Sequence, residues 1–303
     1  MSCGTETADN GRPWLMSALR QDKGLTRACR DDTLRAVGEH DCSMEQEEST
    51  DDTWRKVFND ASILIEHVPS PLGKPVGEWS RTEQTESYGV AVAWGWLMRT
   101  KRTAEAALML HSLGYGVEVA PLARSVIEHT VRLQWAAERG RQEFVEVMLR
   151  NQKATLDNII TAAKSGFPLT IEQLAKIEAL QSNAGDEFKS LDYEAAFAHV
   201  IERLPHLTHA HQVWLLMSRE SHPSLTSASP YSDWLSSEPG WQLYLTPKTT
   251  ATGGEMLMTA MLCTAALAYG IVASLHAYFD EELDRLDTRI SVLLAQQAGS
   301  SAD

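Results

Sequence analysis

Residues 256–275 read MLMTAMLCTAALAYGIVASL, a stretch of 20 residues without a charged side chain. Its length would suffice to cross a bilayer. However, Thr259, Thr264 and Ser274 interrupt the apolar residues, and the flanking charges are the acidic Glu255 and Asp280 rather than Lys or Arg anchors. These features are typical of a helix that other helices cover on all sides. The stretch therefore predicts the central helix of an α-bundle, with no membrane partner.

Helical patterns surround this stretch. Apolar residues recur about every 3.6 positions, and Gly and Pro separate the segments. Pro121 either kinks the segment that contains it or occupies its first turn. Residues 222–247 are the least regular, and no alternation of β-branched residues requires a sheet. We expect an all-α bundle of about seven to nine helices, with segments at 53–68, 80–113, 116–138, 141–165, 170–183, 192–203, 208–221, 250–278 and 279–297.

The N-terminal part of the 303-residue chain differs in composition. Residues 1–52 carry 12 acidic and 6 basic side chains and few large apolar ones. Such a segment buries too little apolar surface to offset its conformational entropy. We therefore predict a disordered or loosely helical acidic arm over 1–52, a single α-helical domain over 53–297 and a flexible tail over 298–303.

Net charge, cysteine content and the first residues indicate which partners, cysteine sites and cellular location to expect. The net charge of −14 argues against binding to nucleic acid. The four cysteines form no Cys-x-x-Cys pair, so neither a disulfide framework nor a thiolate zinc site is expected. The first residues, MSCGTETADNGRPW, lack the apolar run of a secretory signal, which predicts a cytoplasmic location.

Several common catalytic signatures are missing from the sequence. It contains neither a phosphate-binding glycine loop nor a Gly-x-Ser-x-Gly nucleophile turn, and no histidine follows a glutamate by three residues. On an unbroken helix Glu202, His206 and His209 could hold a metal, but Pro205 interrupts that helix. We therefore expect no metal and no cofactor.

Two segments carry the candidate site. In VEVAPLARSVIEHTVRLQWAAERG (117–140), Arg124 and Glu128 stand four residues apart among apolar neighbours, so they share one helix face and can pair. That pair either fixes the helix register or serves a function. His222 precedes Pro223 at a predicted helix C-terminus, where it either hydrogen-bonds the last carbonyls or transfers a proton. Arg124, Glu128 and His222 are therefore the candidate catalytic residues.

The same two segments carry a resemblance. Arg-Ser-Val-Ile-Glu, and later Ser-x-x-x-His-Pro, are similar to motifs of a bacterial family of helical proteins classed as a domain of unknown function. The motifs match here at Arg124, Ser125 and Glu128, and at Ser218, His222 and Pro223. The resemblance covers roughly residues 55–280. It implies an α-bundle in which Arg124, Glu128 and His222 meet, and it implies no activity.

Three classes of function remain. The first is a regulatory or protein-interaction role. Its partner would be an unidentified protein, and formation of a homodimer is one possibility. The second is a metal-independent ribonuclease of a toxin or phage-defence type, which has an Arg-x(4–6)-His signature. Arg124 and His129 match this signature. However, they are five residues apart on one predicted helix, which separates them by about 140° around its axis. The third is a small-molecule site in the bundle, lined by tryptophans and oriented by Arg124 and Glu128. No motif assigns or excludes catalysis. The tryptophans are Trp94, Trp96, Trp135 and Trp214.

Overall fold

The computed structural model describes residues 50–68, 81–183, 197–204, 207–235, 240–248 and 254–300. Residues 1–49 of the predicted arm and the last three residues of the predicted tail lie outside these ranges. The all-α prediction is confirmed. Leaving aside the single turn α9, the described residues form nine helices, and their only sheet is one short hairpin.

The helices agree closely with the predicted segments. The longer ones are α2 (Thr50–Glu66), α3 (Arg81–Ser112), α4 (Ala120–Arg139), α5 (Arg141–Lys164), α6 (Ile171–Asn183), α8 (Thr208–Ser221), α10 (Gly254–Ala273) and α11 (His276–Ser300). The short ones are α7 (Phe197–Glu202), α9 (Leu225–Ala228) and the 3-10 turn η6 (Ser229–Tyr231). The break between α10 and α11 comes earlier than expected. Ser274 there adopts a positive φ of 58°, and Leu275 N donates to Gly270 O.

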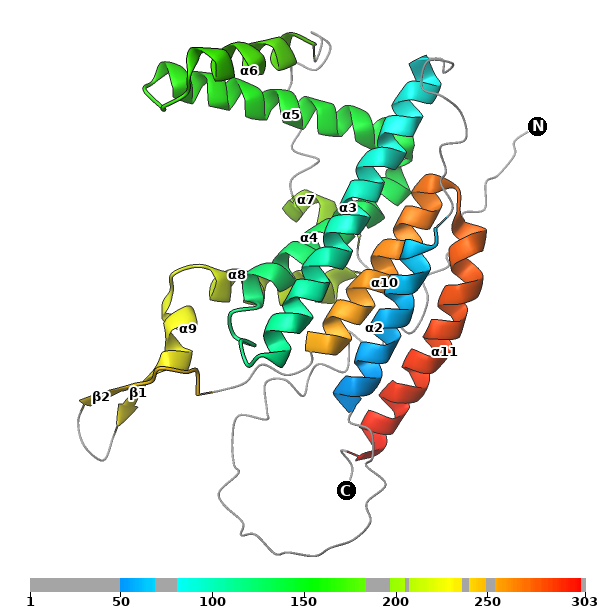
Figure 1. Ribbon diagram of the computed structural model, residues 1–303, viewed down its shortest axis with the longest axis vertical. Coiled ribbons are helices and arrows are strands. Elements are labelled where there is room, and N and C mark those ends of the chain that lie inside the picture. Colours follow the sequence, from blue (N-terminus) through cyan, green and yellow to red (C-terminus); the bar gives the residue numbers. More distant parts are fainter. Residues whose placement is uncertain are drawn as a thin grey trace, which may run out of the picture.

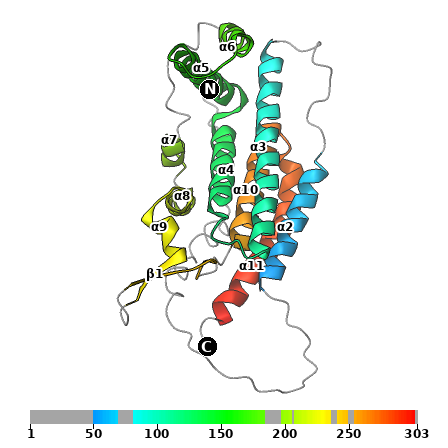
Figure 2. The ribbon, with the colours of Figure 1, turned by 60° about the vertical axis from the view of Figure 1, so that its left-hand side comes forward.

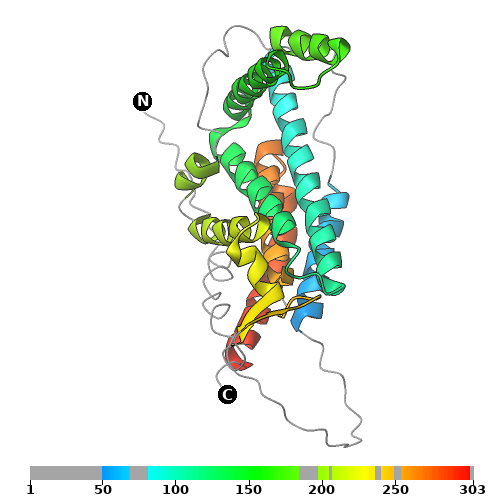
Figure 3. The same cartoon turned by 90° about the vertical axis from the view of Figure 1, so that its left-hand side faces the viewer.

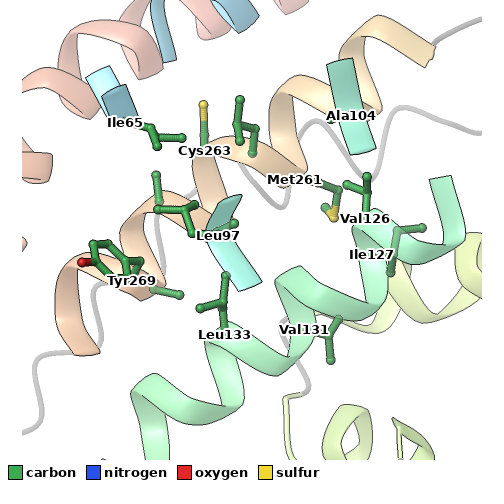
Figure 4. Close-up of a cluster of buried hydrophobic side chains, with 14 of the residues drawn as sticks. Ile65, Leu97, Ala104, Val126, Ile127, Val131, Leu133, Met261, Cys263 and Tyr269 are labelled. Carbon is green, nitrogen blue, oxygen red and sulfur yellow. The ribbon is translucent and has the colours of Figure 1, made fainter. Parts of the chain in front are cut away.

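The uncharged stretch forms the central helix α10, which packs against α2, α3, α4 and α11. Figure 4 shows its Met261, Cys263 and Tyr269 among side chains of α2, α3 and α4. All residues from Met258 to Ala266 are buried, which confirms the predicted central helix. Among the described residues, α10 is also the one helix long and apolar enough to cross a membrane, and 78% of its most apolar window is buried in the protein.

The buried threonine side chains of α10 donate hydrogen bonds to main-chain oxygens. Thr264 Oγ1 donates to Ala260 O at 2.7 Å, and Thr259 Oγ1 donates to Glu255 O at 2.7 Å. From α4, Thr130 Oγ1 and Gln134 Nε2 donate to carbonyls of α10. Because an unpaired polar group is costly to bury, these bonds explain how threonines occupy the middle of the bundle.

The peripheral elements attach at two ends of the bundle. Helices α5 and α6 project from one end of the long helix α3, whereas α9 and the hairpin lie towards the opposite end (Figures 1 and 3). In Figure 2, α4 stands between α8 on one side and α3 with α10 on the other. Trp214 of α8 contacts both Arg124 and Glu128, so the face of α4 that carries these two residues is the face that α8 partly covers.

The hairpin was not indicated by the sequence pattern. Strand β1 (Ser232–Leu235) pairs antiparallel with β2 (Gly240–Leu243), and Trp234 lies opposite Trp241. Each strand is only four residues long and contains no β-branched residue, so alternation could not reveal it. Main-chain bonds beyond the strands, from Tyr244 N to Tyr231 O and from Lys248 N to Pro230 O, hold the ends together.

A buried ionic cluster joins three helices at the start of α10. The Glu255 side chain is only 3% exposed, and its Oε1 lies 3.1 Å from both Arg55 Nη2 on α2 and His111 Nδ1 on α3. Its second oxygen, Oε2, has no hydrogen-bond partner among the described residues. Nothing in the sequence pattern pointed to this cluster, because Glu255 lies 200 positions from Arg55 and 144 positions from His111 along the chain.

Candidate functional site

The site is built on α4, whose ends follow from local sequence. Pro121 lies in the first turn, which settles the alternative left open above, and Gly140 ends the helix with a φ of 86°. Val126, Ile127 and Leu133 are fully buried against the bundle. Arg124 and Glu128 lie on another side of α4, which is partly exposed.

Arg124 and Glu128 form the predicted i,i+4 pair. Arg124 Nε donates to Glu128 Oε1 at 3.0 Å. The two side chains keep 28% and 31% of their surface exposed, so the pair is neither fully buried nor fully solvated.

Helix α8 and the residue after it complete the cluster. Trp214 Nε1 donates to the same Glu128 oxygen at 2.9 Å, and the Arg124 guanidinium carbon lies 5.1 Å from the Trp214 ring centroid. Arg124 Nη1 lies 3.1 Å from His222 Nε2. A guanidinium can only donate, so this contact is a hydrogen bond when Nε2 is unprotonated. Arg124 thus links Glu128 and His222, and all three candidate residues converge.

The loop after α8 holds His222 in place. His222 has extended backbone angles, φ −103° and ψ 149°, as expected for a residue before proline. Immediately afterwards Ser224 caps α9 in a reciprocal pair with Ser227, and its Oγ also donates to Arg219 O at 2.8 Å. With both sides of the loop fixed, the imidazole reaches across to α4. This contact differs from the capping alternative, in which the imidazole would bond the last carbonyls of its own helix.

Positive charge gathers beside this cluster. His129 Nδ1 donates to Ser125 O at 2.7 Å. Burial lowers the pKa of His129 below its usual value, and the charges of Arg99 and Arg132 lower it further. Burial likewise lowers the pKa of Arg132, an effect that the Glu128 carboxylate opposes. Arg99 and Arg132 therefore add positive charge near His129, and Arg132 also interacts with the Glu128 carboxylate, in a chain whose net charge is −14. Arg132 could have been anticipated, since it follows Glu128 by one turn.

The structure shows no contact between the two residues of the Arg-x(4–6)-His match. Arg124 turns towards Glu128 while His129 bonds the carbonyl of Ser125, in keeping with their angular separation on the helix. The tryptophans do not line one site either. Trp214 stacks on Phe197 with centroids 4.4 Å apart, and it is the tryptophan that contacts Arg124. The others sit elsewhere, with Trp94 against Tyr269 and with Trp96 and Trp135 against Phe144.

No metal centre accompanies the cluster in the part of the chain that the structure describes. Within those ranges, no three His, Cys, Asp or Glu side chains are arranged to hold a metal ion. His206 of the triplet considered above lies outside the described residues.

Replacing Glu128 with alanine should lower the free energy of unfolding by about 1 kcal/mol, because it removes the Arg124 pair and the acceptor of the Trp214 indole. Glu128→Gln keeps an acceptor for the indole and should cost less. Glu172→Ala, in an exposed i,i+4 pair with Lys176, is the matched control and should cost about 0.3–0.5 kcal/mol. Urea unfolding measures all three, and equal losses for Glu128→Ala and Glu172→Ala would contradict the role of Trp214.

Comparison with known proteins gives a match to one family model over the residues that carry the site. Residues 90–238 match the model of a family of unknown function, DUF5677. The match is narrower than the 55–280 expected from the motifs, but it contains Arg124, Glu128, Trp214 and His222 and excludes α2, α10 and α11. No curated protein and no solved structure shows significant similarity to the chain. The resemblance to a domain of unknown function is thus supported over just under half of the chain, and no activity comes with it.

Proposed function

We propose that this protein is a regulatory helical bundle that binds an anionic small molecule, with a phosphate or carboxylate group, at the cluster of Arg124, Glu128, Trp214 and His222. The observation that carries the proposal is the bridging position of Arg124. Its guanidinium contacts Glu128, Trp214 and His222 at once, and the Arg124 side chain as a whole keeps 28% of its surface exposed. A positioned, partly exposed guanidinium is the group that proteins use to recognise oxyanions.

The surrounding charges support the same ligand class. Arg132 adds positive charge near Glu128, and both Arg99 and Arg132 disfavour protonation of His129, the residue after Glu128. A bound anion would offset the repulsion between these arginines and a protonated His129. Glu128 would repel the anion, but it is already neutralised by Arg124 and accepts a hydrogen bond from Trp214. The balance therefore favours a small oxyanion over a cation or a neutral ligand.

Inorganic pyrophosphate is the first probe for this proposal. If it binds with a dissociation constant of about 1 mM, then about 10 mM should raise the free energy of unfolding by about 1.4 kcal/mol relative to sodium chloride of equal ionic strength. Arg124→Gln should abolish that gain. Arg285→Gln, the same change at an exposed arginine of α11, should leave it intact. The proposal fails if sodium chloride stabilises as much as pyrophosphate, or if Arg124→Gln responds like the wild type.

A second candidate function rests on the 3.1 Å contact between Arg124 and His222. An unprotonated imidazole beside a guanidinium could accept a proton while the cation stabilises a phosphorane, as metal-independent RNA cleavage requires. His222 would then take the place that the signature assigned to His129. Cleavage of single-stranded RNA in the presence of EDTA tests this candidate. Activity that disappears in His222→Ala but persists in His129→Ala would favour it over binding alone.

A further inference from the structure

A second concave site lies away from the arginine cluster, between α3 and α5. Its volume is about 320 Å³. From α3 it is lined by Tyr88, Val92 and Trp96, which are spaced by four residues and therefore share one face. Phe144, at the start of α5, forms part of the opposite wall. The volume falls at the lower end of the range found for small-molecule pockets, which is about 300–1,000 Å³.

The pocket exists because α5 is anchored at one end only. At Gly89 a Cβ atom would lie 3.1 Å from both Arg141 O and Val145 Cγ2, so the first turn of α5 touches the backbone of α3. The Arg141 side chain also donates to Val272 O and to Ser274 Oγ at the end of α10. Beyond this anchor α5 leaves α3 at a wide angle (Figure 1). The pocket lies between α3 and the part of α5 that follows this anchor.

The lining determines the class of ligand. Of the ten lining residues, seven are apolar or aromatic, none is charged, and the other three carry an amide or hydroxyl group. A charged ligand would lose its hydration there without gaining a counter-charge from the lining. The polar residues Asn151, Gln152 and Thr155 all come from α5 and so gather at one end of the pocket. Thr155 Oγ1 donates to Asn151 O and keeps acceptor capacity for a ligand.

The exposed apolar surface at this site is otherwise unexplained. Tyr88 is 48% exposed, although it stands beside the fully buried Phe144 and Val145. Trp96 and Met148 are only partly buried against the core. Aromatic groups at the mouth of a preformed apolar pocket are typical of small-molecule sites.

We propose that the α3–α5 pocket binds an uncharged, largely apolar small molecule, with a flat aromatic or compact aliphatic body and one polar group directed at Asn151, Gln152 and Thr155. This site is independent of the oxyanion site proposed above. None of its lining residues belongs to the arginine cluster, so the two proposals can fail separately.

The test uses N-phenyl-1-naphthylamine, an uncharged aromatic probe with one N–H group, whose emission rises in apolar surroundings. The probe is excited directly, so added tryptophans do not interfere. The wild-type protein should bind it saturably at one site per chain. Met148→Trp, which fills the pocket from α5, should weaken binding at least about tenfold. Met109→Trp is the matched control at an exposed position outside the pocket and should leave binding unchanged.

Two further measurements keep this test decisive. Val92→Phe fills the pocket from α3 and should weaken binding as Met148→Trp does, so a folding defect in one variant does not decide the result. The sulfonated analogue 1-anilinonaphthalene-8-sulfonate should bind at least about tenfold more weakly than the uncharged probe. Equal binding by wild type and both filled variants would overturn the pocket as a site. Equal binding of the sulfonate, if lost in the filled variants, would overturn the uncharged class.

Discussion

Replacing Arg55 with methionine is expected to lower the free energy of unfolding by about 3 kcal/mol, the largest single loss that we predict. The reason is the burial of Glu255, whose side chain is 3% exposed and whose Oε2 has no partner among the described residues. Without Arg55 the carboxylate keeps only the His111 contact at its Oε1. We place the cost at the lower end of the range for broken buried pairs because the Arg55 side chain is itself 39% exposed.

The double variant separates charge from packing. Arg55→Met with Glu255→Met removes both charges and keeps apolar volume, so it should be clearly milder than Arg55→Met alone. Lys176→Met removes one member of an exposed pair on α6 and should cost no more than about 0.5 kcal/mol. Urea unfolding gives the free energy of unfolding of all three variants, which are compared when their curves have equal slopes. A double variant as unstable as the single one would show that the loss comes from packing and not from the orphaned carboxylate.

Replacing Gly270 with alanine should destabilise the protein by about 2 kcal/mol through overpacking. A Cβ at this position would lie 2.7 Å from Phe279 Cδ2, where α10 passes α11. The Phe279 ring is fully buried, and it packs edge-on against Tyr269 and Tyr278, so it cannot swing aside without disturbing both. The gain in helix propensity from glycine to alanine, about 0.5–1 kcal/mol, offsets only part of this cost.

Gly95 on α3 provides the matched control with the opposite sign. It is also a helical glycine, but nothing lies within 4 Å of the Cβ that alanine would add. Gly95→Ala should therefore stabilise the protein by about 0.5–1 kcal/mol. Thermal unfolding of the two variants checks the pair. Shifts of the same sign would mean that the close approach of α10 and α11 does not govern the response at Gly270.

The candidate site was predictable in part. The pairing of Arg124 with Glu128 follows from helical spacing alone, and the extended conformation of His222 follows from Pro223. The approach of His222 to Arg124 spans 98 residues, and that of Trp214 to Glu128 spans 86. No local rule sets such distances, and here they depend on how α8 lies across α4. The motif resemblance implied the meeting of Arg124, Glu128 and His222. Trp214 was one of four tryptophans considered for a small-molecule site, but its hydrogen bond to Glu128 came only with the structure.

The helices and the central position of residues 256–275 follow from local sequence alone. The signals are the spacing of apolar residues, glycine at helix C-termini and proline at helix N-termini. Each of them involves only a few neighbouring residues, so the sequence shows them directly. The tertiary structure decided the buried cluster around Glu255, the pocket between α3 and α5, and the β-hairpin. It also determined how much space surrounds Gly95 and Gly270. Both are glycines within helices, but only at Gly270 would an added Cβ meet a neighbouring side chain. These features depend on which helix faces meet and at what angle, and side-chain packing between distant segments sets that geometry.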